Sequence, residues 1–384
     1  MRPIERNPFI IGGYVSPYYF CDRETESSEL LTAILNHRNT AVISSRRMGK
    51  TGLIQHCFHF NEIKKEHYSF FIDIYSTGSL KELAYLLGKE IFDTLKPKGR
   101  KFIDNFFNII SSLRPALKLD TLTGAPIFDI GIGEIVKPEY SIEQIFTYLE
   151  SSDKPCVVAI DEFQQIAKYP EKNIEAILRT HIQKCTNTTF IFAGSQHHMM
   201  RNIFFSPSRP FYQSVSLIHL GPIPLKEYRK FITRQMKNGD RIIDEELIER
   251  VYNLFEGHTW YIQNIFHRLY SIMEKDEECT MRMIEQCVRN TVNSFVPMFE
   301  EILTLLPEKQ KEVMYAIAKE GKAKEMTSSS FVRKHGLKSP STVQSALRQL
   351  LEKEFITREN NAYSVYDRFF GLWLAEKFGT GYAV

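Results

Sequence analysis

The sequence lacks any long apolar run. None of its apolar stretches approaches the roughly 20 residues that a helix needs to cross a bilayer. Its start at Met1 lacks the apolar core of a signal peptide. Internal repeats and low-complexity tracts are also absent from the sequence. We therefore expect a soluble, cytoplasmic protein without a membrane partner.

Cysteine pairs are missing too. The six cysteines form no C-x-x-C pair, and none has a histidine at the spacing of a metal finger. We expect all six to be reduced thiols, several of them buried.

The chain has little excess of charge of either sign. It carries 49 basic and 46 acidic residues, a net charge of +3, which is too small to suggest a nucleic-acid coat. The exception is the segment 307–384, where 13 basic and 9 acidic residues give a local charge of +4. A length of 384 residues with 43% apolar and 25% charged residues is typical of a globular protein with two or three domains.

Short apolar runs separated by helical stretches fill the first part of the chain. Because the runs are continuous rather than alternating, they predict strands of an α/β sheet that is covered by helices on both faces. A further stretch, 118–133, predicts an inserted hairpin. The expected strands lie at 40–43, 68–74, 156–160, 189–193 and 215–220.

Prolines that interrupt the helical patterns predict a division of the chain into three domains. The α/β domain is expected over 1–223, and a helical domain over 224–296 lies between Pro224 and Pro297. The third domain, 297–384, shows three helical patterns followed by two short strands. That order is typical of a winged helix.

The most informative stretch follows the first apolar run. Residues 44–51 read Ser-Ser-Arg-Arg-Met-Gly-Lys-Thr and lead into an apolar helical pattern. Such a turn binds phosphates because its backbone N–H groups point inward and the following helix supplies its positive end. Lys50 is expected to reach the β- and γ-phosphates, and the Thr51 hydroxyl to bind Mg²⁺. Ser44 replaces the first glycine of G-x-x-x-x-G-K-T, so this motif alone leaves an ordinary helix start open.

A second strand end supplies acidic groups for the same chemistry. Asp161 and Glu162 directly follow the apolar run 156–160. A P-loop ATPase needs one Asp there to hold Mg²⁺ and a neighbouring base to polarise the attacking water. Asp161 suits the first role and Glu162 the second. The alternative is a strand capped by solvated acids. Two acids directly after five apolar residues, 110 positions after Thr51, favour the ATPase interpretation.

A third strand ends at Gly194-Ser195-Gln196. A polar side chain at this tip can contact the γ-phosphate or the attacking water. Ser195 is the better candidate and Gln196 the alternative, while an ordinary turn serine stays open. The adjacent His197-His198 predicts a helix start rather than a metal site.

Together these residues resemble the archaeal-type ATPases, a P-loop group close to AAA+ proteins and to the signalling NTPases called STAND. Phe20-Cys-Asp-Arg23-Glu-Thr-Glu26 resembles the family's F-x-D/G-R-E-x-E segment, which wraps the adenine side. Residues 44–51 are similar to its G/S-P-R-R-x-G-K-T/S loop, and 161–164 to its D-E-F/I-Q strand end. The resemblance implies ATP or ADP as ligand and Mg²⁺ as cofactor. The implied nucleotide-binding residues are Phe20, Arg23, Ser45, Arg46, Arg47, Met48, Gly49, Lys50, Thr51, Gly52 and His258.

The resemblance continues into the later domains. Gly257-His258-Thr259 is similar to the G-H-P motif of the family's helical lid, which faces the phosphates, although a helix cap is the alternative for His258. Residues 363–374 resemble the family's closing D-P-x-F-x-x-W-L stretch. The expected fold is thus an AAA+-like P-loop NTPase sheet, a helical lid and a C-terminal winged helix.

Three positions depart from the family. Ser45 and Thr259 each replace a proline, and the third departure bears on catalysis. Many members carry P-L-Y-G-R after the sensor strand, and its Arg can serve as a charge-stabilising finger. Here Ser214 occupies that position, and Arg209 lies just upstream. A finger contributes roughly 10³–10⁵ in rate, so its displacement favours slow turnover. Arg209 is the candidate replacement, with pairing to a surface acid as the alternative.

The helix expected at 340–353 is the one that would enter a DNA major groove. Ser341, Gln344, Ser345 and Arg348 are expected to face outward. A protein-binding or dimer surface is the alternative for this face. The sequence does not distinguish a monomer from a homo-oligomer.

Three functions compete on this sequence. The first is an Mg²⁺-dependent ATPase switch whose winged helix transmits the nucleotide state to DNA or a protein partner. The second is a nucleotide-gated binding module that hydrolyses ATP slowly or not at all. The third is a DNA-binding regulator whose P-loop domain mainly mediates assembly.

Overall fold

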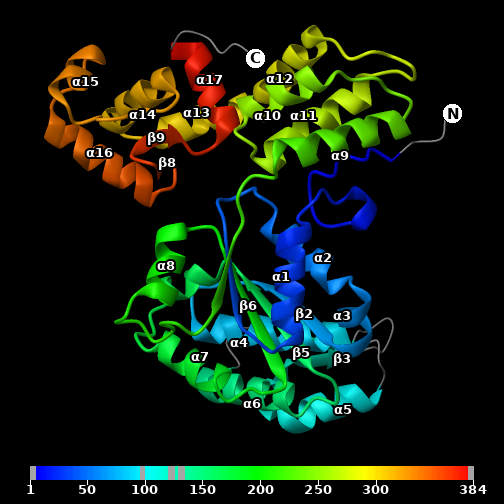
Figure 1. The fold of residues 1–384 in the computed structure, drawn as a ribbon. Helices are drawn as coiled ribbons and strands as arrows, with labels where there is room; N and C mark the ends of the chain where they lie inside the picture. Colours follow the sequence, from blue (N-terminus) through cyan, green and yellow to red (C-terminus); the bar gives the residue numbers. More distant parts are fainter. Residues whose placement is uncertain (1–5, 96–99, 120–125, 129–134, 379–384) are drawn as a thin grey trace. The chain divides into compact units, whose positions relative to one another are not determined.

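A computed structural model describes residues 6–95, 100–119, 126–128 and 135–378 (Figure 1). Two compact units divide the chain. One comprises 12–222, and the other joins the segment before Gly12 to the chain from Ile223 onward. The expected boundary at 296/297 lies inside the second unit, and the division into three domains stays a prediction.

The first unit is built on a five-stranded parallel sheet. Its strand order is β2-β5-β6-β1-β7, so β6 lies between β1 and β5. Since the strands are parallel, their carboxyl ends meet at one edge of the sheet, which brings together the residues that follow β1, β5 and β6. The strands are β1 (Thr40–Ile43), β2 (Tyr68–Asp73), β5 (Cys156–Asp161), β6 (Thr188–Gly194) and β7 (Ser216–His219).

Helices cover both faces of this sheet. One face packs on the helices that precede β2, with Val42 among its buried residues. The other face packs on the later helices through alternate strand residues such as Ala41 and Ile43. The predicted α/β fold with two covered faces is therefore confirmed. The first group is α1 (Glu24–Leu35), α2 (Lys50–Phe58) and α3 (Asn61–Glu66); the second is α4 (Leu80–Leu95), α5 (Arg100–Ile109), α6 (Pro138–Glu150), α7 (Ile174–Ile182) and α8 (His197–Phe205).

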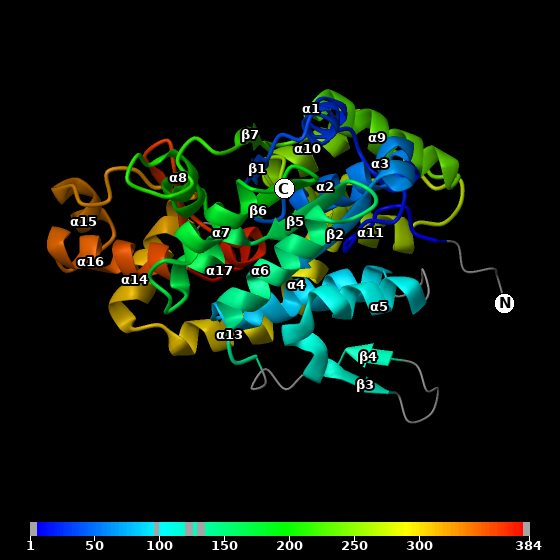
Figure 2. The same ribbon diagram turned by 90° about the horizontal axis from the view of Figure 1, so that it is seen from below.

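The inserted hairpin is also present. β3 (Leu117–Leu119) pairs antiparallel with β4 (Pro126–Phe128), and β4 contacts α4 (Figure 2). Residues 120–125 and 129–134 of the predicted hairpin lie outside the described residues. Short 3₁₀ helices occur at Pro17–Tyr19, Ser111–Ala116 and Phe163–Lys168.

The helices α9 to α12 occupy most of residues 225–294 in the second unit, where the sequence predicts helical structure. N-terminal residues pack on them: Asn7 donates to the carbonyl of His267 at 2.7 Å, and the buried Phe9 ring contacts Phe231, Phe266 and Tyr270. Burial of Phe9 explains why this segment joins the second unit rather than the first. The helices are α9 (Leu225–Asn238), α10 (Glu245–Leu254), α11 (Thr259–Ile272) and α12 (Met281–Ser294).

The winged helix completes the second unit. Its two strands pair antiparallel across Asn360 and Asn361, which both have positive φ, as the tight turn of a hairpin requires. The elements after α12 are α13 (Val296–Leu305), α14 (Glu308–Glu320), α15 (Ser329–Lys334), α16 (Pro340–Glu352), β8 (Ile356–Glu359), β9 (Ala362–Val365) and α17 (Arg368–Phe378). No helix in the described part of the chain combines the length and the apolar character of a membrane span.

Candidate active site

The loop between β1 and α2 has the backbone of a phosphate-binding turn. Arg47 and Gly49 both have positive φ, at 66° and 94°. A side chain at Gly49 would meet no atom within 4 Å, so conformation rather than space requires glycine there. Lys50 then begins α2, whose first N–H groups lack partners within the helix and can bind an anion.

Lys50 is buried next to two carboxylates. Only 6% of this residue is exposed. Burial lowers the pKa of its ammonium, while the neighbouring Asp161 and Glu162 oppose that shift and Arg46 adds to it. The structure therefore brings the end of β1 and the end of β5 together, as the sequence predicts.

Thr51 and Asp161 form a direct contact across these two strand ends. The Thr51 hydroxyl donates to Asp161 Oδ2 at 2.8 Å. Burial raises the pKa of Asp161, and Lys50 and the Thr51 hydroxyl partly offset this. Mg²⁺ prefers oxygen ligands and usually binds one or two carboxylates together with substrate phosphates, so this pair fits the ion. In the described ranges no cluster of three or more His, Cys, Asp or Glu forms a cage for a metal.

Glu162 is held by side chains from two directions. The Ser195 hydroxyl, just after β6, donates to Glu162 Oε2 at 2.8 Å, and the Gln164 amide donates to the same oxygen. Ser195 thus lies beside the expected base. Gln164 is not among the site residues predicted from the sequence, although its position two residues after Glu162 was a signal that could have found it.

Two residues of the segment 20–26 lie against this region: Phe20 contacts α2, and Arg23 contacts the loop before it. The Phe20 ring stacks on His56 at 4.3 Å between centroids and would touch a Cβ placed at Gly52. Arg23 is 3% exposed and donates to the carbonyls of Met48 at 3.1 Å and Gly221 at 2.7 Å. Arg23 therefore supports the loop through protein atoms, and its predicted contact with nucleotide stays a prediction.

The remaining loop residues differ in their surroundings. Met48 is buried, whereas Ser45, Arg46 and Arg47 are partly exposed. The Arg46 guanidinium lies 5.6 Å from the centre of the Tyr75 ring. Their predicted contacts with nucleotide stay predictions.

Arg209 pairs with an acid, but not with a surface one. Its guanidinium bonds Glu175 in the first turn of α7, and Glu175 is only 6% exposed. Burial raises the pKa of Glu175, while Arg209 opposes the rise. The Ser214 hydroxyl donates to the carbonyl of Phe211. Whether Arg209 leaves this pair to act as a finger stays a prediction.

His258 belongs to the second unit. It is the residue before α11, and its Nδ1 lies 3.0 Å from the carbonyl oxygen of Phe255. Burial lowers its pKa, and Arg368 adds to this effect. Its predicted contact with phosphates stays a prediction.

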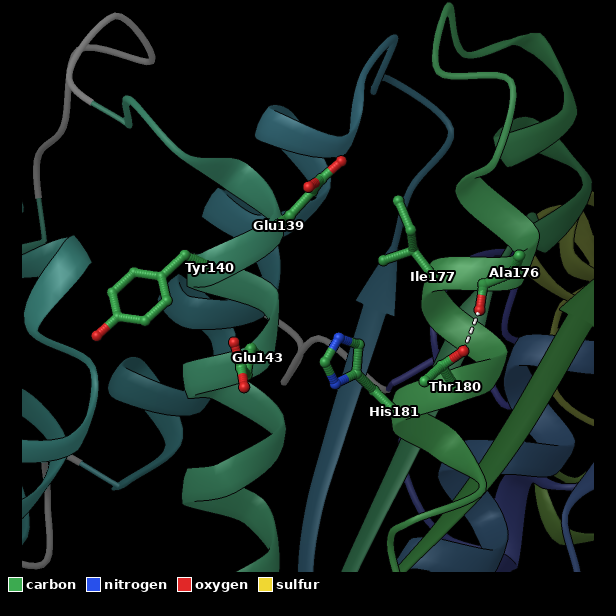
Figure 3. A pocket seen from close by; sticks show the side chains of 7 residues that line it. All are labelled: Glu139, Tyr140, Glu143, Ala176, Ile177, Thr180 and His181. Carbon is green, nitrogen blue, oxygen red and sulfur yellow. Dashed lines mark hydrogen bonds between the residues drawn. The ribbon is translucent and has the colours of Figure 1, made fainter.

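A groove between α6 and α7 is a different kind of site. Glu139 and Glu143 face it from α6, and His181 faces it from α7 (Figure 3). Burial lowers the pKa of His181, and Glu143 opposes this. Because two carboxylates would repel phosphates, this groove does not fit a nucleotide.

The family of this chain is established by a match to a family model. Residues 20–265 match the model of an ATPase domain found predominantly in Archaea. The chain belongs to this ATPase family. Residues 297–376 match the model of a "probable winged helix domain", which confirms the predicted C-terminal fold. No curated protein matches the chain.

Solved structures support the family's fold over nearly the whole chain. A Walker-type ATPase of Pyrococcus abyssi is 17% identical, with a TM-score of 0.64 over 96% of this chain and 99% of that one. The ORC2 protein of Aeropyrum pernix, in ADPNP–ADP complexes, is 11% identical, with a TM-score of 0.61 over 98% of both chains. The ORC1 protein of the same organism, in complex with DNA, is 12% identical, with a TM-score of 0.52 over 94% of both.

Proposed function

We propose that this protein is an Mg²⁺-dependent ATPase switch that couples its nucleotide state to the winged helix. The observation that carries the proposal is the Thr51–Asp161 hydrogen bond of 2.8 Å beside the buried Lys50. It joins a hydroxyl and a carboxylate at the end of a phosphate-binding turn. Membership of the ATPase family and the ADPNP–ADP complexes of the ORC2 structure support ATP and ADP as ligands.

Each residue of the site has a role in the proposed hydrolysis. The turn and Lys50 bind the β- and γ-phosphates, while Thr51 and Asp161 hold Mg²⁺, which neutralises phosphate charge when bound. Glu162 accepts a proton from the attacking water. The water oxygen bonds to the γ-phosphorus as the bond to the bridging oxygen breaks, so that ADP and phosphate leave.

The winged helix is the proposed output of the switch. On α16, Ser341, Gln344, Ser345 and Arg348 are exposed, while Val343 and Leu347 are buried. Together with the local charge of +4 and the DNA complex of the ORC1 structure, this exposed polar face supports double-stranded DNA as the partner. A protein partner on the same face is the alternative.

Slow or absent hydrolysis is the second candidate. Ser214 stands at the family's finger position, and the candidate replacement Arg209 is paired with Glu175. Without a free guanidinium, the charge that grows on the γ-phosphate lacks one stabilising group.

Arg209 acting from a neighbouring subunit of a homo-oligomer is tested by mixing two variants. In the mixture, a Lys50→Ala subunit supplies its Arg209 to the intact phosphate site of an Arg209→Ala subunit, so some activity is restored.

Single-turnover and steady-state hydrolysis test the proposal. We expect the wild-type protein, in excess over radiolabelled ATP, to form ADP and phosphate with Mg²⁺ and to stop when the ion is chelated. Steady-state rates with and without duplex DNA then show whether the winged helix is coupled to turnover. Tight ATP binding with no product after many hours would instead favour the nucleotide-gated module.

A further inference from the structure

Gln164 is a buried polar side chain that the proposed hydrolysis does not use. It lies in the 3₁₀ helix Phe163–Lys168 after β5 and is only 3% exposed. Its Nε2 donates to Glu162 Oε2, the oxygen that also accepts from Ser195. Because a carboxylate can only accept hydrogen bonds, the nitrogen end of the amide must face Glu162.

The other end of the Gln164 amide is packed tightly. Its Oε1 is buried and has no hydrogen-bond partner among the described residues. It lies over Gly194, where an added Cβ would overlap Gln164 Oε1 and come within 2.5 Å of Met200 Sδ. Gly194 thus leaves room for Gln164. A buried acceptor without a donor lowers the stability of the fold. The hydrogen bond that this amide does form is the one from its nitrogen to Glu162.

The backbone of Glu162 adds a further restraint. Its φ is 55°, in the left-handed region, and its N–H donates to Asp161 Oδ1 at 2.9 Å. The start of the side chain is therefore set by β5, and its tip is held by donors from two different elements. Both donors bond Oε2, and neither of them bonds Oε1.

We infer that Gln164 is a positioning residue for Glu162, an inference that rests on the proposed ATPase activity. Gln164 and Ser195 together fix Oε2, and this leaves Oε1 pointing away from both donors to take the proton of the attacking water. A carboxylate on a flexible side chain otherwise samples several orientations. Holding it in one of them raises the rate of proton transfer without changing ATP binding.

Gln164→Met tests this inference because methionine keeps the length and burial of the side chain but removes the donor. We expect the single-turnover rate to fall about 10- to 100-fold, while the Kd for ATP stays within about 3-fold of wild type. Gln165→Met is the matched control. The Gln165 amide donates to the carbonyl of Thr77 at 2.8 Å rather than to Glu162, so this variant should hydrolyse ATP at the wild-type rate.

A second background separates positioning from a merely structural role. In Glu162→Gln protein the carboxylate is gone, so adding Gln164→Met should slow the residual hydrolysis no further. A similar loss in both backgrounds would overturn the inference. Gly194→Ala offers an independent route, because its Cβ displaces the Gln164 amide without removing it, and the same loss is expected. This variant replaces Gln164→Met in the comparison if the latter does not fold.

The outcomes distinguish this inference from the proposed function. A wild-type protein that forms no ADP in a single turnover overturns the ATPase activity itself. A wild-type protein that does form ADP, with Gln164→Met and Gly194→Ala at the same rate, overturns only the role of Gln164.

Discussion

The carboxyl ends of the parallel strands and the outward face of α16 are both polar, but they are polar in different ways. At the strand ends Lys50, Asp161 and Ser195 are each less than 10% exposed, and hydrogen bonds or close charges join them to neighbouring site residues. On α16 the side chain of Arg348 is 73% exposed and lies 4.0 Å from Glu352, an exposed pair of little energetic weight.

This difference shows that burial of polar side chains indicates a functional site more strongly than exposed polar side chains do. Burying a charge or hydroxyl costs free energy unless each group finds a partner, so a buried polar cluster at a strand edge needs a functional reason. Exposing polar side chains on a helix has no such free-energy cost, so their exposure alone does not point to a particular partner. The proposed ATPase site is therefore supported by buried contacts, whereas the proposed DNA contact is supported by the winged-helix fold, the local charge of +4 and one related structure in complex with DNA.

The largest effect is expected from Lys50→Ala, which removes the ammonium from the strand-end cluster. Charge-assisted hydrogen bonds contribute roughly 1.5–3 kcal/mol each, so we expect ATP affinity to fall by about 100-fold or more. Calorimetric titration with ATP measures this. Lys64→Ala, which alters an exposed lysine on α3, is the control and should bind ATP like wild type. Unchanged affinity in Lys50→Ala would contradict the phosphate-site assignment.

A smaller effect is expected from Arg209→Ala, which tests whether a buried charge pair away from the strand ends is structural. Burial raises the pKa of Glu175 and Arg209 opposes that rise, so losing Arg209 raises the pKa further. A raised carboxyl pKa favours the folded state at low pH, and this stability is lost as pH increases through the folded-state pKa.

We therefore expect Arg209→Ala to lower the free energy of unfolding by about 1–3 kcal/mol at pH 8 and by less at pH 5. Urea unfolding at the two pH values measures the difference. Arg201→Ala, an exposed arginine on α8, is the control. An equal loss at both pH values would mean that Glu175 does not carry the effect.

The smallest effect is expected on the exposed face. Arg348→Ala should weaken binding to duplex DNA only several-fold and reduce the salt dependence of binding by about one charge, with ATP hydrolysis unchanged. Fluorescence anisotropy across a salt series measures both quantities. Arg250→Ala, on the exposed side of α10, should leave them at their wild-type values. If the two variants bind DNA identically, α16 does not contact DNA through Arg348.

Sequence reasoning found the strand-end residues because local patterns encode them. Lys50 follows its glycine in the chain, Asp161 and Glu162 follow an apolar run, and parallel strands bring such ends to one edge. The family model confirms the fold that these patterns predict.

The contacts that sequence reasoning missed join residues far apart in the chain. Arg23 bonds the carbonyl of Gly221, 198 positions away, and Asn7 bonds that of His267, 260 positions away. The partner of Arg209 is likewise a buried acid 34 positions upstream. No local pattern encodes such pairs, because they depend on which side chains the finished packing brings together.

The central claim is that the residues at the strand ends, Lys50, Thr51, Asp161 and Glu162, hydrolyse ATP, with Glu162 as the base. Glu162→Gln tests it most directly, because the change keeps the shape of the side chain but removes its ability to take a proton. After incubation with radiolabelled ATP and Mg²⁺, the nucleotide bound to each protein is extracted and separated. We expect wild type to hold ADP, and Glu162→Gln to hold ATP, with hydrolysis slowed by about 100-fold or more and ATP affinity unchanged. Equal conversion to ADP by both proteins would contradict the account.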